Sequence, residues 1–568
     1  MKLKELRIRN FRGLSGEQNI IKFDDSNIIF LIGQNNIGKS SFLNAYNFFV
    51  ASRKKAEKED FFDYNITNNI EIEADFISEP NDSDNSDFNS EPDWIDKWIQ
   101  SETNIITIKK VWDSIGSEFK KYTKNVDGEF VENGFGGLST LFTKYAPTPL
   151  FINAIETPES FEKKVNEIID KEHLKKIQRD YQEDYNNAIT AITKIQDSIT
   201  SSESIVQYNH NLNLSFQKVF PNLSLKISIK KEESGIDLVK AFKTNHSIDV
   251  IKDGVDRKET FSQHGHGVIR QALFNFLAFM KNQSNSNTKE YLLLFEEPEL
   301  FLHPKSTYLL REELYRLSEN SPFQILCATH SPQMIDISKP HSSLVRISKD
   351  INENVITHQV GHNIFMNEIN KNFVQMINRF NPNICEVFYS DNVIIVEGDT
   401  EAIIFREILK NNYPESDYFI LNSGSKNNIP FFQRILNHFQ IDYVVIHDCD
   451  TRYIYKDKAR TELKFNKDGV TPSKNSAWSL NQIIWDELQN ANGNIVHRII
   501  SKYDFESASG YVYNTDDGKP LSAYKYATNN FTDSNNYAVA TIKSIVEQTF
   551  NKQWTQEEVE QIEEPVII

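Results

Sequence analysis

Hydrophobic and polar positions alternate at the start of the chain and then give way to a short, wholly apolar run. LKELRIRNFRG places Leu3, Leu6 and Ile8 among charged residues, which is typical of a half-buried strand. NIIFLIG (27–33) predicts a short buried strand, and SFLNAYNFFV predicts a helix directly after the glycine loop GQNNIGKS. Residues 1–50 therefore predict a strand, a turn, a strand, a glycine loop and a helix.

Further along the chain, apolar runs that suit buried strands alternate with helical patterns. These runs are YLLLFEE after the polar loop 281–289, VIIVEG near 393, YFILNSG (418–424) and YVVIHDCD (443–450). Strands that alternate with helices favour a mainly parallel sheet, so we predict an α/β fold class. The stretch 78–93, rich in Ser, Asn, Asp and Pro, predicts a surface loop.

The segment 158–204 has a different pattern, because its apolar residues recur at roughly helical spacing without glycine or an internal proline. We expect long helices there. They form either a coiled-coil-like arm or bundle helices within the same domain, and the residues favour neither alternative.

Composition narrows the class of protein without deciding its partners. A chain of 568 residues predicts three or four domains. The sequence contains no run of 18 apolar residues, so we expect no membrane span. The N-terminus lacks the apolar core of a signal peptide, and the three scattered cysteines form no CxxC pair. We therefore expect a cytoplasmic protein without disulfides or structural zinc. The net charge of −18 argues against DNA binding over the whole surface, but it allows a local basic groove or bound cations.

The glycine loop carries the first clear chemical signal. Residues 33–40 match GxxxxGK[ST] between a predicted strand and a predicted helix, which is the context that a phosphate-binding loop requires. Lys39 would reach the β- and γ-phosphates of ATP, and the Ser40 hydroxyl would bind Mg²⁺. The predicted nucleotide-binding residues are Gly33, Asn35, Asn36, Gly38, Lys39, Ser40, Ser41 and Glu296.

A second predicted strand supplies the acids that ATP hydrolysis needs. LLLFEEPE ends in Glu296, which we expect to hold Mg²⁺, and Glu297, which we expect to polarise the attacking water. The next strand leads into ATHSPQMID, which would place His330 near the γ-phosphate as a sensor.

These segments resemble an ABC-type ATPase head of the kind seen in SMC, Rad50 and RecF proteins. The resemblance covers LRIRNFRG, the glycine loop, LLLFEEPELFLHP and ATHSPQMID. It implies that a signature segment from a partner subunit closes over ATP, and the candidate is 261–271 with Ser262, Gly265 and Gly267. This segment departs from the usual LSGGQ and suits a glycine-containing helix start equally well. EEPE also departs from the commoner Asp-Glu, but it retains both carboxylates.

The last third of the chain carries a second group of acids. Glu397 follows the strand VIIV, Glu401 lies four residues on, and Asp448 and Asp450 end the strand YVVIHDCD. Parallel strands that end side by side bring such carboxylates together, and crowded carboxylates need cations. Oxygen ligands select Mg²⁺ or Mn²⁺, which can activate water for phosphodiester cleavage. Taken singly, each acid also suits a helix N-terminus or a turn.

This order of motifs resembles the Toprim fold of topoisomerases, primases and certain nucleases. A Toprim domain behind an ABC-type head is similar to the OLD (overcoming lysogenization defect) family of ATP-dependent nucleases, including the Gabija nuclease subunit and retron-associated proteins. The resemblance implies a two-metal site that uses Glu397, Glu401, Asp448 and Asp450. It also implies further residues from the C-terminal part. The candidates are Glu506 as a metal ligand and Lys519 as a stabiliser of transition-state charge, and ordinary surface charge suits both equally well. For Asp399 a capping role suffices.

The resemblance also predicts the domains and the biological role. The predicted domains are 1–155 and 216–385 for the two parts of the ATPase, 156–215 for a helical dimerisation insertion, and 386–568 for the Toprim nuclease. The implied function is ATP-dependent, metal-dependent DNA cleavage in anti-phage defence by a homodimer or larger oligomer. A helicase, or a reverse transcriptase with its DNA product, is an implied partner, and no membrane is involved. The alternatives are a Rad50- or RecF-like DNA clamp without nuclease activity, and topoisomerase or primase chemistry.

Overall fold

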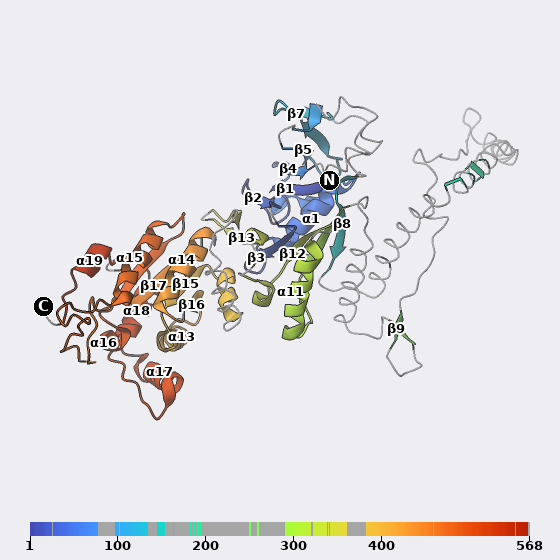
Figure 1. Ribbon diagram of the computed structural model, residues 1–568. Coiled ribbons are helices and arrows are strands. Elements are labelled where there is room, and N and C mark those ends of the chain that lie inside the picture. Colours follow the sequence, from blue (N-terminus) through green and yellow to red (C-terminus); the bar gives the residue numbers. More distant parts are fainter. Residues whose placement is uncertain are drawn as a thin grey trace. The chain divides into compact units, whose positions relative to one another are not determined.

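The computed structural model describes residues 1–77, 97–153, 290–360 and 382–565, apart from 25, 101–102, 135–144, 320–321, 338, 340, 351, 458 and 551–552. Scattered residues between 163 and 260 are also described. The chain divides into two compact units. Met1–Ala154 and Met280–Ile568 form the first unit, and Ile155–Phe279 form the second. Figure 1 shows the helices and strands of the described residues.

The first sheet is antiparallel and is built from the N-terminal part of the chain. Its strand order is β2-β1-β4-β5-β6-β7. The strands are β1 (Lys2–Arg9), β2 (Asn19–Lys22), β4 (Ile70–Ile77), β5 (Ile105–Trp112), β6 (Lys120–Lys124) and β7 (Phe130–Glu132). Leu3, Leu6 and Ile8 are buried, so the strand predicted from their spacing is confirmed.

The second sheet carries the glycine loop. Its order is β14-β13-β3-β12-β11-β8, and every neighbouring pair is parallel except β13 with β14. The strands are β3 (Ile28–Ile32), β8 (Thr148–Ile152), β11 (Tyr291–Glu296), β12 (Phe323–Ala328), β13 (Leu344–Lys349) and β14 (Val355–Gln359). Helix α1 (Lys39–Val50) buries Phe42, Leu43 and Tyr46 in the same core as Ile29 and Leu294, and α11 (Pro304–Ser318) follows β11. The prediction of a mainly parallel sheet is confirmed.

The third sheet is wholly parallel, with the order β16-β15-β17-β18. Its strands are β15 (Asn392–Val396), β16 (Tyr418–Asn422), β17 (Asp442–Asp448) and β18 (Val496–Ser501). The helices around it are α13 (Asp399–Asn412), α14 (Ile429–His438), α15 (Ser476–Gln489), α16 (Phe505–Ser509), α17 (Gly518–Asn530), α18 (Tyr537–Val546) and α19 (Gln556–Glu560). Helices α13, α17 and α18 share one apolar core with Ile394 and Val444. Because β15 and β17 are parallel neighbours, their carboxyl ends meet at one edge of the sheet.

The second and third sheets are joined by contacts at the amino ends of the Toprim strands. Arg346 of β13 is only 3% exposed, and its guanidinium lies 2.6 Å from Asp391, the residue before β15. Gln34 of the glycine loop donates its side-chain amide to Asp391 (2.8 Å) and to Asp417 (3.1 Å), the residue before β16. The glycine loop therefore contacts the ends of β15 and β16 that lie opposite Glu397.

Several expectations fall on parts of the chain that the structure does not describe. The loop 78–93 and the candidate signature segment 261–271 lie outside the described residues, as does nearly all of the helical insertion 156–215. Within the second unit, β9 (Asp249–Ile251) pairs antiparallel with β10 (Lys258–Thr260). The domain boundaries therefore stay predictions. Among the helices described, none has the length and apolar character to cross a membrane.

Candidate functional site

The glycine loop has the backbone that a phosphate-binding loop needs. Gly33 adopts φ +142°, and a Cβ atom there would lie 2.4 Å from the carbonyl oxygen of Ile347. Gly38 adopts φ +103°, and Asn36 also has a positive φ, of 60°. Any side chain at Gly33 would collide with β13, so glycine is required at this position. Asn35 and Asn36 are exposed at the tip of the loop.

Lys39 is held inside this loop. It is 4% exposed, and its Nζ donates to the carbonyl oxygens of Gly33 (2.8 Å) and Gln34 (2.7 Å). Burial lowers the pKa of Lys39 to about 8, while Glu297 and Glu299 oppose the shift. An ammonium bound only to carbonyl oxygens can turn to a phosphate with little cost, because a charge-assisted bond replaces a neutral acceptor.

The end of β11 supplies the oxygen ligands expected for Mg²⁺. The Ser40 hydroxyl donates to Glu296 Oε1 at 2.5 Å, so these two predicted ligands converge from α1 and β11. Ser41 has a different role, because its hydroxyl accepts a 3.4 Å hydrogen bond from the backbone N–H of Gly13. A hydroxyl and a carboxylate at this position suit a hard cation.

Glu297 and His330, the expected water-polarising acid and γ-phosphate sensor, lie next to each other. His330 Nε2 is 3.4 Å from Glu297 Oε1, and burial followed by Lys39 lowers the pKa of His330. Glu297 also adopts φ +44°, which costs a residue with a Cβ roughly 1 kcal/mol or more and is commonest at functional sites. The structure adds Glu299, which accepts hydrogen bonds from the Thr329 hydroxyl (2.6 Å) and the His330 N–H (3.0 Å). Glu299 thus fixes the backbone at His330. In the sequence, Glu299 is the third acid of EEPE, and this is the signal from which its role could have been predicted.

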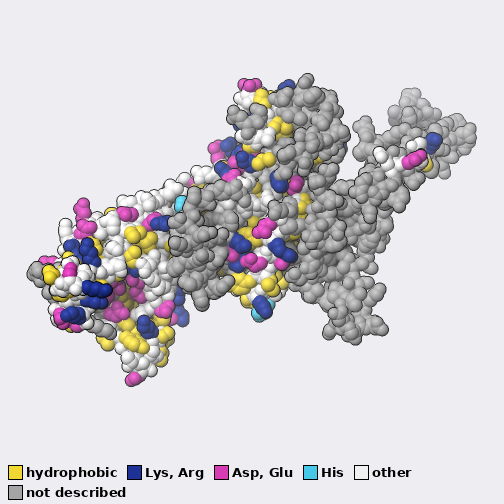
Figure 2. Space-filling view, in the orientation of Figure 1, with side chains coloured by type: hydrophobic (Ala, Val, Ile, Leu, Met, Phe, Trp, Pro, Cys, Tyr) yellow, Lys and Arg dark blue, Asp and Glu magenta, His cyan; other side chains and the backbone are white. Residues whose placement is uncertain are grey.

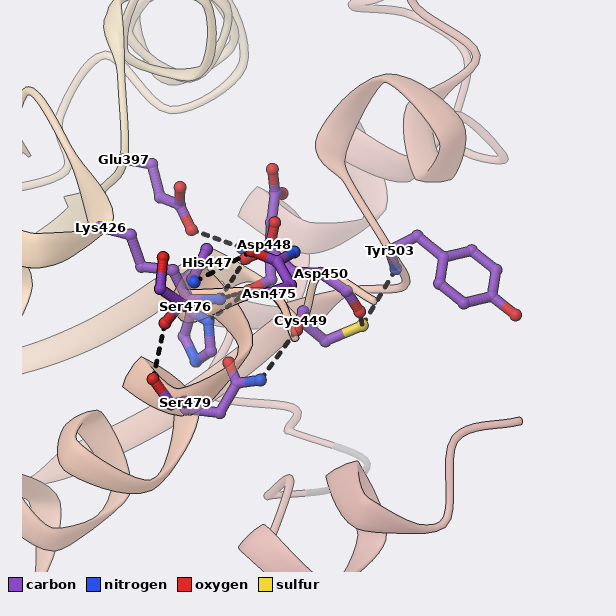
Figure 3. Close-up of polar contacts among 12 residues, drawn as sticks. Glu397, Lys426, His447, Asp448, Cys449, Asp450, Asn475, Ser476, Ser479 and Tyr503 are labelled. Atoms are coloured by element: carbon purple, nitrogen blue, oxygen red, sulfur yellow. Dashed lines mark hydrogen bonds and ion pairs between the residues drawn. The ribbon is translucent and has the colours of Figure 1, made fainter. Parts of the chain in front are cut away.

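The second group of acids gathers at the carboxyl ends of β15 and β17 (Figure 3). The backbone N–H of Asp448 donates to Glu397 Oε1 at 2.8 Å, which confirms that the two strand ends meet. Burial raises the pKa of Glu397 to about 7, with Lys426 opposing the shift. Burial, then the Glu397 and Glu401 carboxylates, raise the pKa of Asp448 to about 10. Asp448 Oδ1 is buried and has no hydrogen-bond partner among the described residues.

Glu401 and Glu506 extend this group, whereas Lys519 does not. Burial raises the pKa of Glu401, and Glu506 in the first turn of α16 adds to the shift, so the two carboxylates are neighbours. Lys519 lies exposed in the first turn of α17, and no hydrogen bond or ion pair of the described residues ties it to the carboxylates. The geometry thus gives Glu506 a neighbour in the group and Lys519 none.

The carboxylates do not by themselves form a closed metal cage. Among the described residues, no three His, Cys, Asp or Glu side chains are grouped so that they could hold a metal ion as they stand. Lys426 explains the arrangement, because its 5%-exposed ammonium pairs with Asp450 at 2.6 Å and donates to the Asp448 carbonyl oxygen. The orphaned Asp448 oxygen and the hard carboxylate donors nevertheless fit Mg²⁺ or Mn²⁺.

Lys426 is the residue of this site to which the sequence reasoning gave no role. It follows β16 in NSGSKNN, a loop that lies in the sequence between the acids at 397–401 and those at 448–450. The lysine reaches Asp450 because β16 and β17 lie on either side of β15. Asp450 itself adopts φ +57°, a left-handed conformation that aspartate tolerates better than most residues.

Two buried residues of β17 and β18 support the Asp448 backbone through a chain of hydrogen bonds. Arg498 of β18, fully buried, donates Nε to His447 Nε2 at 3.0 Å. Because His447 Nε2 accepts, the proton lies on Nδ1, which donates to the Asp448 carbonyl oxygen at 2.8 Å. Burial, then Arg498, hold the pKa of His447 well below its usual value, so the imidazole stays neutral.

Asp399 corrects one expectation. It begins α13, but the N-cap is Gly398 and no side-chain cap hydrogen bond is made. Instead Asp399 accepts a 2.7 Å hydrogen bond from the side-chain amide of Asn422. The side chain therefore ties the start of α13 to the end of β16, because Asn422 is within reach at the same edge of the sheet.

The fold and the two sites define an ATPase joined to a Toprim domain. Residues 28–336 match the family described as "AAA domain, putative AbiEii toxin, Type IV TA system", and 388–450 match "Overcoming lysogenization defect protein-like, TOPRIM domain". The chain belongs to this AAA family, and its C-terminal domain is of the OLD-like Toprim type. The second match includes Glu397, Glu401, Lys426, Asp448 and Asp450 and ends before Glu506 and Lys519.

The similar proteins confirm the predicted relationship to the OLD nucleases. The chain is 24% identical over 473 residues to Old nuclease of Escherichia phage P2, covering 79% of this chain and 77% of that protein. It is 22% identical over 471 residues to Endonuclease GajA of Bacillus cereus (strain VD045), covering 80% and 75%. The SMC head domain from Thermotoga maritima is 14% identical and covers 64% of this chain and 100% of that one. Its TM-score of 0.32 is too low to establish a shared fold.

Proposed function

We propose that this protein is a Mg²⁺- or Mn²⁺-dependent DNA endonuclease whose cleavage is controlled by ATP. The observation that carries the proposal is the meeting of Glu397 and Asp448 at adjacent strand ends, with a buried Asp448 oxygen that lacks a partner among the described residues. Glu401 and Asp450 lie in the same electrostatic group. The relatives named Old nuclease and Endonuclease GajA support this proposal.

Four carboxylates would hold the metal, namely Glu397, Glu401, Asp448 and Asp450, with Glu506 beside Glu401. When bound, the ions activate a water and stabilise the departing oxygen of the phosphodiester. Lys426 keeps Asp450 and the Asp448 carbonyl in place, and it stands ready to balance negative charge that develops on a phosphate. The chain of hydrogen bonds from Arg498 through His447 fixes the same carbonyl.

The ATPase half provides a separate reaction centre. Lys39 and the glycine loop bind the phosphates, while Ser40 and Glu296 supply oxygen ligands for the Mg²⁺ that accompanies ATP. Glu297 orients the attacking water, and His330 beside it senses the γ-phosphate. Glu297 follows β11 with a positive φ of 44°, and its carboxylate lies 3.4 Å from His330.

Gln34 offers a physical route from nucleotide binding to the Toprim sheet. Its backbone carbonyl binds Lys39, and its side chain binds Asp391 and Asp417. When Lys39 turns to a phosphate, the Gln34 carbonyl loses its partner and the loop is free to rearrange. This rearrangement reaches the amino ends of β15 and β16, whose carboxyl ends carry the acids and the Lys426 loop. A ligand shifts such an equilibrium only by binding one loop arrangement better than the other.

The proposed setting is anti-phage defence in the cytoplasm, with DNA as substrate. The relatives named Endonuclease GajA and Old nuclease support the nuclease part of this proposal, and the resemblance to the OLD family motivates the defence setting. We further propose a homodimer or higher oligomer that is held together by the insertion 156–215. We also propose that the protein acts with a defence partner, either a helicase or a reverse transcriptase with its DNA product.

The test uses the full-length protein on supercoiled and linear DNA with Mg²⁺ or Mn²⁺, with and without ATP. Wild type should nick or cut DNA, whereas Glu397→Ala and Asp448→Ala should lose at least 100-fold in rate. Asp399→Asn is the matched control, because Asp399 lies in the same turn but is exposed and faces Asn422. Lys39→Ala should lose ATP hydrolysis.

Cleavage that persists in Glu397→Ala and Asp448→Ala would remove the Toprim site from the reaction. Retention of DNA by a protein that hydrolyses ATP but never cuts would favour the clamp alternative. Religated topoisomers without nicked product would favour topoisomerase chemistry instead.

A further inference from the structure

A basic segment leaves the carboxylate site and returns to it. Residues 451–475, which we name the basic arm, begin directly after Asp450 and end at the start of α15. Isolated bridges pair Tyr453 with Lys474, Tyr455 with Leu463, and Phe465 with Pro472. The arm is therefore a folded projection whose two ends both lie beside Asp450.

The base of the arm is anchored to the site. The backbone N–H of Asn475 donates to the Arg452 carbonyl at 2.8 Å, and the Asn475 side chain caps α15 by accepting from the Ala477 N–H at 3.0 Å. From the next turn, Asn481 donates to the Cys449 carbonyl at 2.8 Å. Figure 3 shows Asn475 among the site residues Asp448 and Asp450. The direction of the arm is thus fixed relative to the carboxylates.

The charge of the arm is opposite to that of the whole chain. The arm contains seven Lys or Arg and three Asp or Glu, a net charge of +4, in a chain whose net charge is −18. Figure 2 shows Lys and Arg side chains grouped at the end of the view that carries the C-terminus, beside a larger acidic group. Basic residues are dispersed along the sequence as a whole, but the arm carries seven of them in the segment that directly follows Asp450.

Three lysines of the arm are available for a partner. Lys456 pairs with Glu462, and Arg460 pairs with Asp504, so these charges are balanced within the protein. Lys464, Lys467 and Lys474 are exposed, and the described residues offer them no ion pair. Two apolar side chains of the arm are also exposed, Phe465 (42%) and Val470 (77%). Exposed ammonium groups next to an exposed aromatic ring suit a phosphodiester backbone and its bases.

Electrostatics makes such a surface necessary for the proposed reaction. The carboxylates that would hold metal repel the phosphates of an approaching polyanion until ions neutralise them. The arm begins directly after Asp450, so its positive charge attracts a polyanion toward the strand end that carries the carboxylates, and salt screens this attraction. We propose that the basic arm binds the phosphodiester backbone of DNA beside the scissile phosphate. This inference rests on the proposed nuclease function.

The test compares a triple variant, Lys464→Ala/Lys467→Ala/Lys474→Ala, with wild type in the full chain. Affinity for a fluorescent duplex is measured by anisotropy without divalent metal at several salt concentrations, so the result does not depend on cleavage. We expect the affinity at low salt to fall roughly 10- to 100-fold. The slope of log affinity against log salt should shrink by about 2 to 3, because each lysine neutralises about one phosphate.

The matched control is Lys55→Ala/Lys410→Ala/Lys543→Ala, which removes three exposed lysines elsewhere. It should bind DNA as wild type does. An arm variant with wild-type affinity and slope, or an equal loss in both triple variants, would overturn the inference. Failure of the nuclease proposal is recognised separately: wild type binds DNA through the arm but cuts none with Mg²⁺ or Mn²⁺.

Discussion

Replacing Asp448 with asparagine should stabilise the metal-free protein while abolishing cleavage. Burial and the nearby Glu397 and Glu401 carboxylates raise the pKa of Asp448 from 3.8 to about 10. Such a carboxyl is protonated in the folded protein at neutral pH but ionised in the unfolded chain. The contribution of the Asp448 carboxyl to the stability of the folded protein is therefore fully present below the pKa that this carboxyl has in the unfolded chain. It is lost progressively as the pH rises toward the pKa that the carboxyl has in the folded protein.

The size of the effect follows from the same numbers. At pH 7 the unfolded carboxyl is about 3 pH units above its pKa, and each unit corresponds to about 1.4 kcal/mol, which gives a ceiling of about 4 kcal/mol. Because Asp448 is not wholly buried and its ionisation depends on the charge of Glu397, we expect about half of this ceiling, roughly 2 kcal/mol. For a domain of this size that free energy raises the melting temperature by about 4 to 8 °C.

Thermal unfolding of wild type and Asp448→Asn in EDTA at pH 5, 7 and 8.5 measures the difference. The difference in melting temperature between Asp448→Asn and wild type should widen as the pH rises, because asparagine does not titrate. Adding Mg²⁺ should stabilise wild type and leave Asp448→Asn nearly unchanged, since binding to the folded state alone raises stability. Asp399→Asn, in the same turn as Glu397, should show neither effect.

An Asp448→Asn variant that is less stable than wild type in EDTA at pH 8.5 would refute the electrostatic reasoning. Equal stabilisation of both proteins by Mg²⁺ would show that the ion binds elsewhere. The first result would refute the burial argument for Asp448, and the second would remove the assignment of the strand ends as a metal site.

Three further predictions concern the neighbouring residues. Glu297→Gln should retain ATP binding but release phosphate at least 100-fold more slowly in a coupled assay, since positioned bases contribute about 10² or more; wild-type turnover would exclude Glu297 as the base. Gln34→Ala should hydrolyse ATP within about twofold of wild type, yet DNA nicking should no longer respond to ATP; a preserved response would place the coupling elsewhere. Arg498→Met should raise the Mg²⁺ concentration for half-maximal cleavage roughly 10-fold, with activity returning at high Mg²⁺, because outer partners orient ligands; a loss that Mg²⁺ cannot rescue would indicate a folding role.

The sequence predicted the strands that carry the candidate site residues. It did not predict the antiparallel partners of β1 in the first sheet. β3, β11, β15 and β17 are short apolar runs that end in glycine or acids, and such runs need both faces buried. In β5, Lys109 and Lys110 interrupt the apolar pattern, and Lys110 is nevertheless buried with its ammonium bonded to the Phe49 carbonyl oxygen, so the pattern of this strand is weaker.

The candidate site was predictable in its acids but not in its basic partners. Glu397 and Asp448 each follow an apolar run, so their spacing predicted that they would meet if the strands were parallel neighbours. Lys426 and Arg498 follow no such rule. Their contacts join residues 22 or more positions apart, and these contacts depend on the order β16-β15-β17-β18, which the sequence does not spell out.

By itself the sequence determined the phosphate loop, the acids at the strand ends and the alternation that makes the sheets parallel, because these properties are local to a few consecutive residues. Only the tertiary structure decided that Lys426 stands among the carboxylates, that Gln34 contacts the residues before β15 and β16, and that the two ends of the basic arm are joined at its base. Charges interact through space rather than along the chain, so their partners are set by the folded path of the backbone.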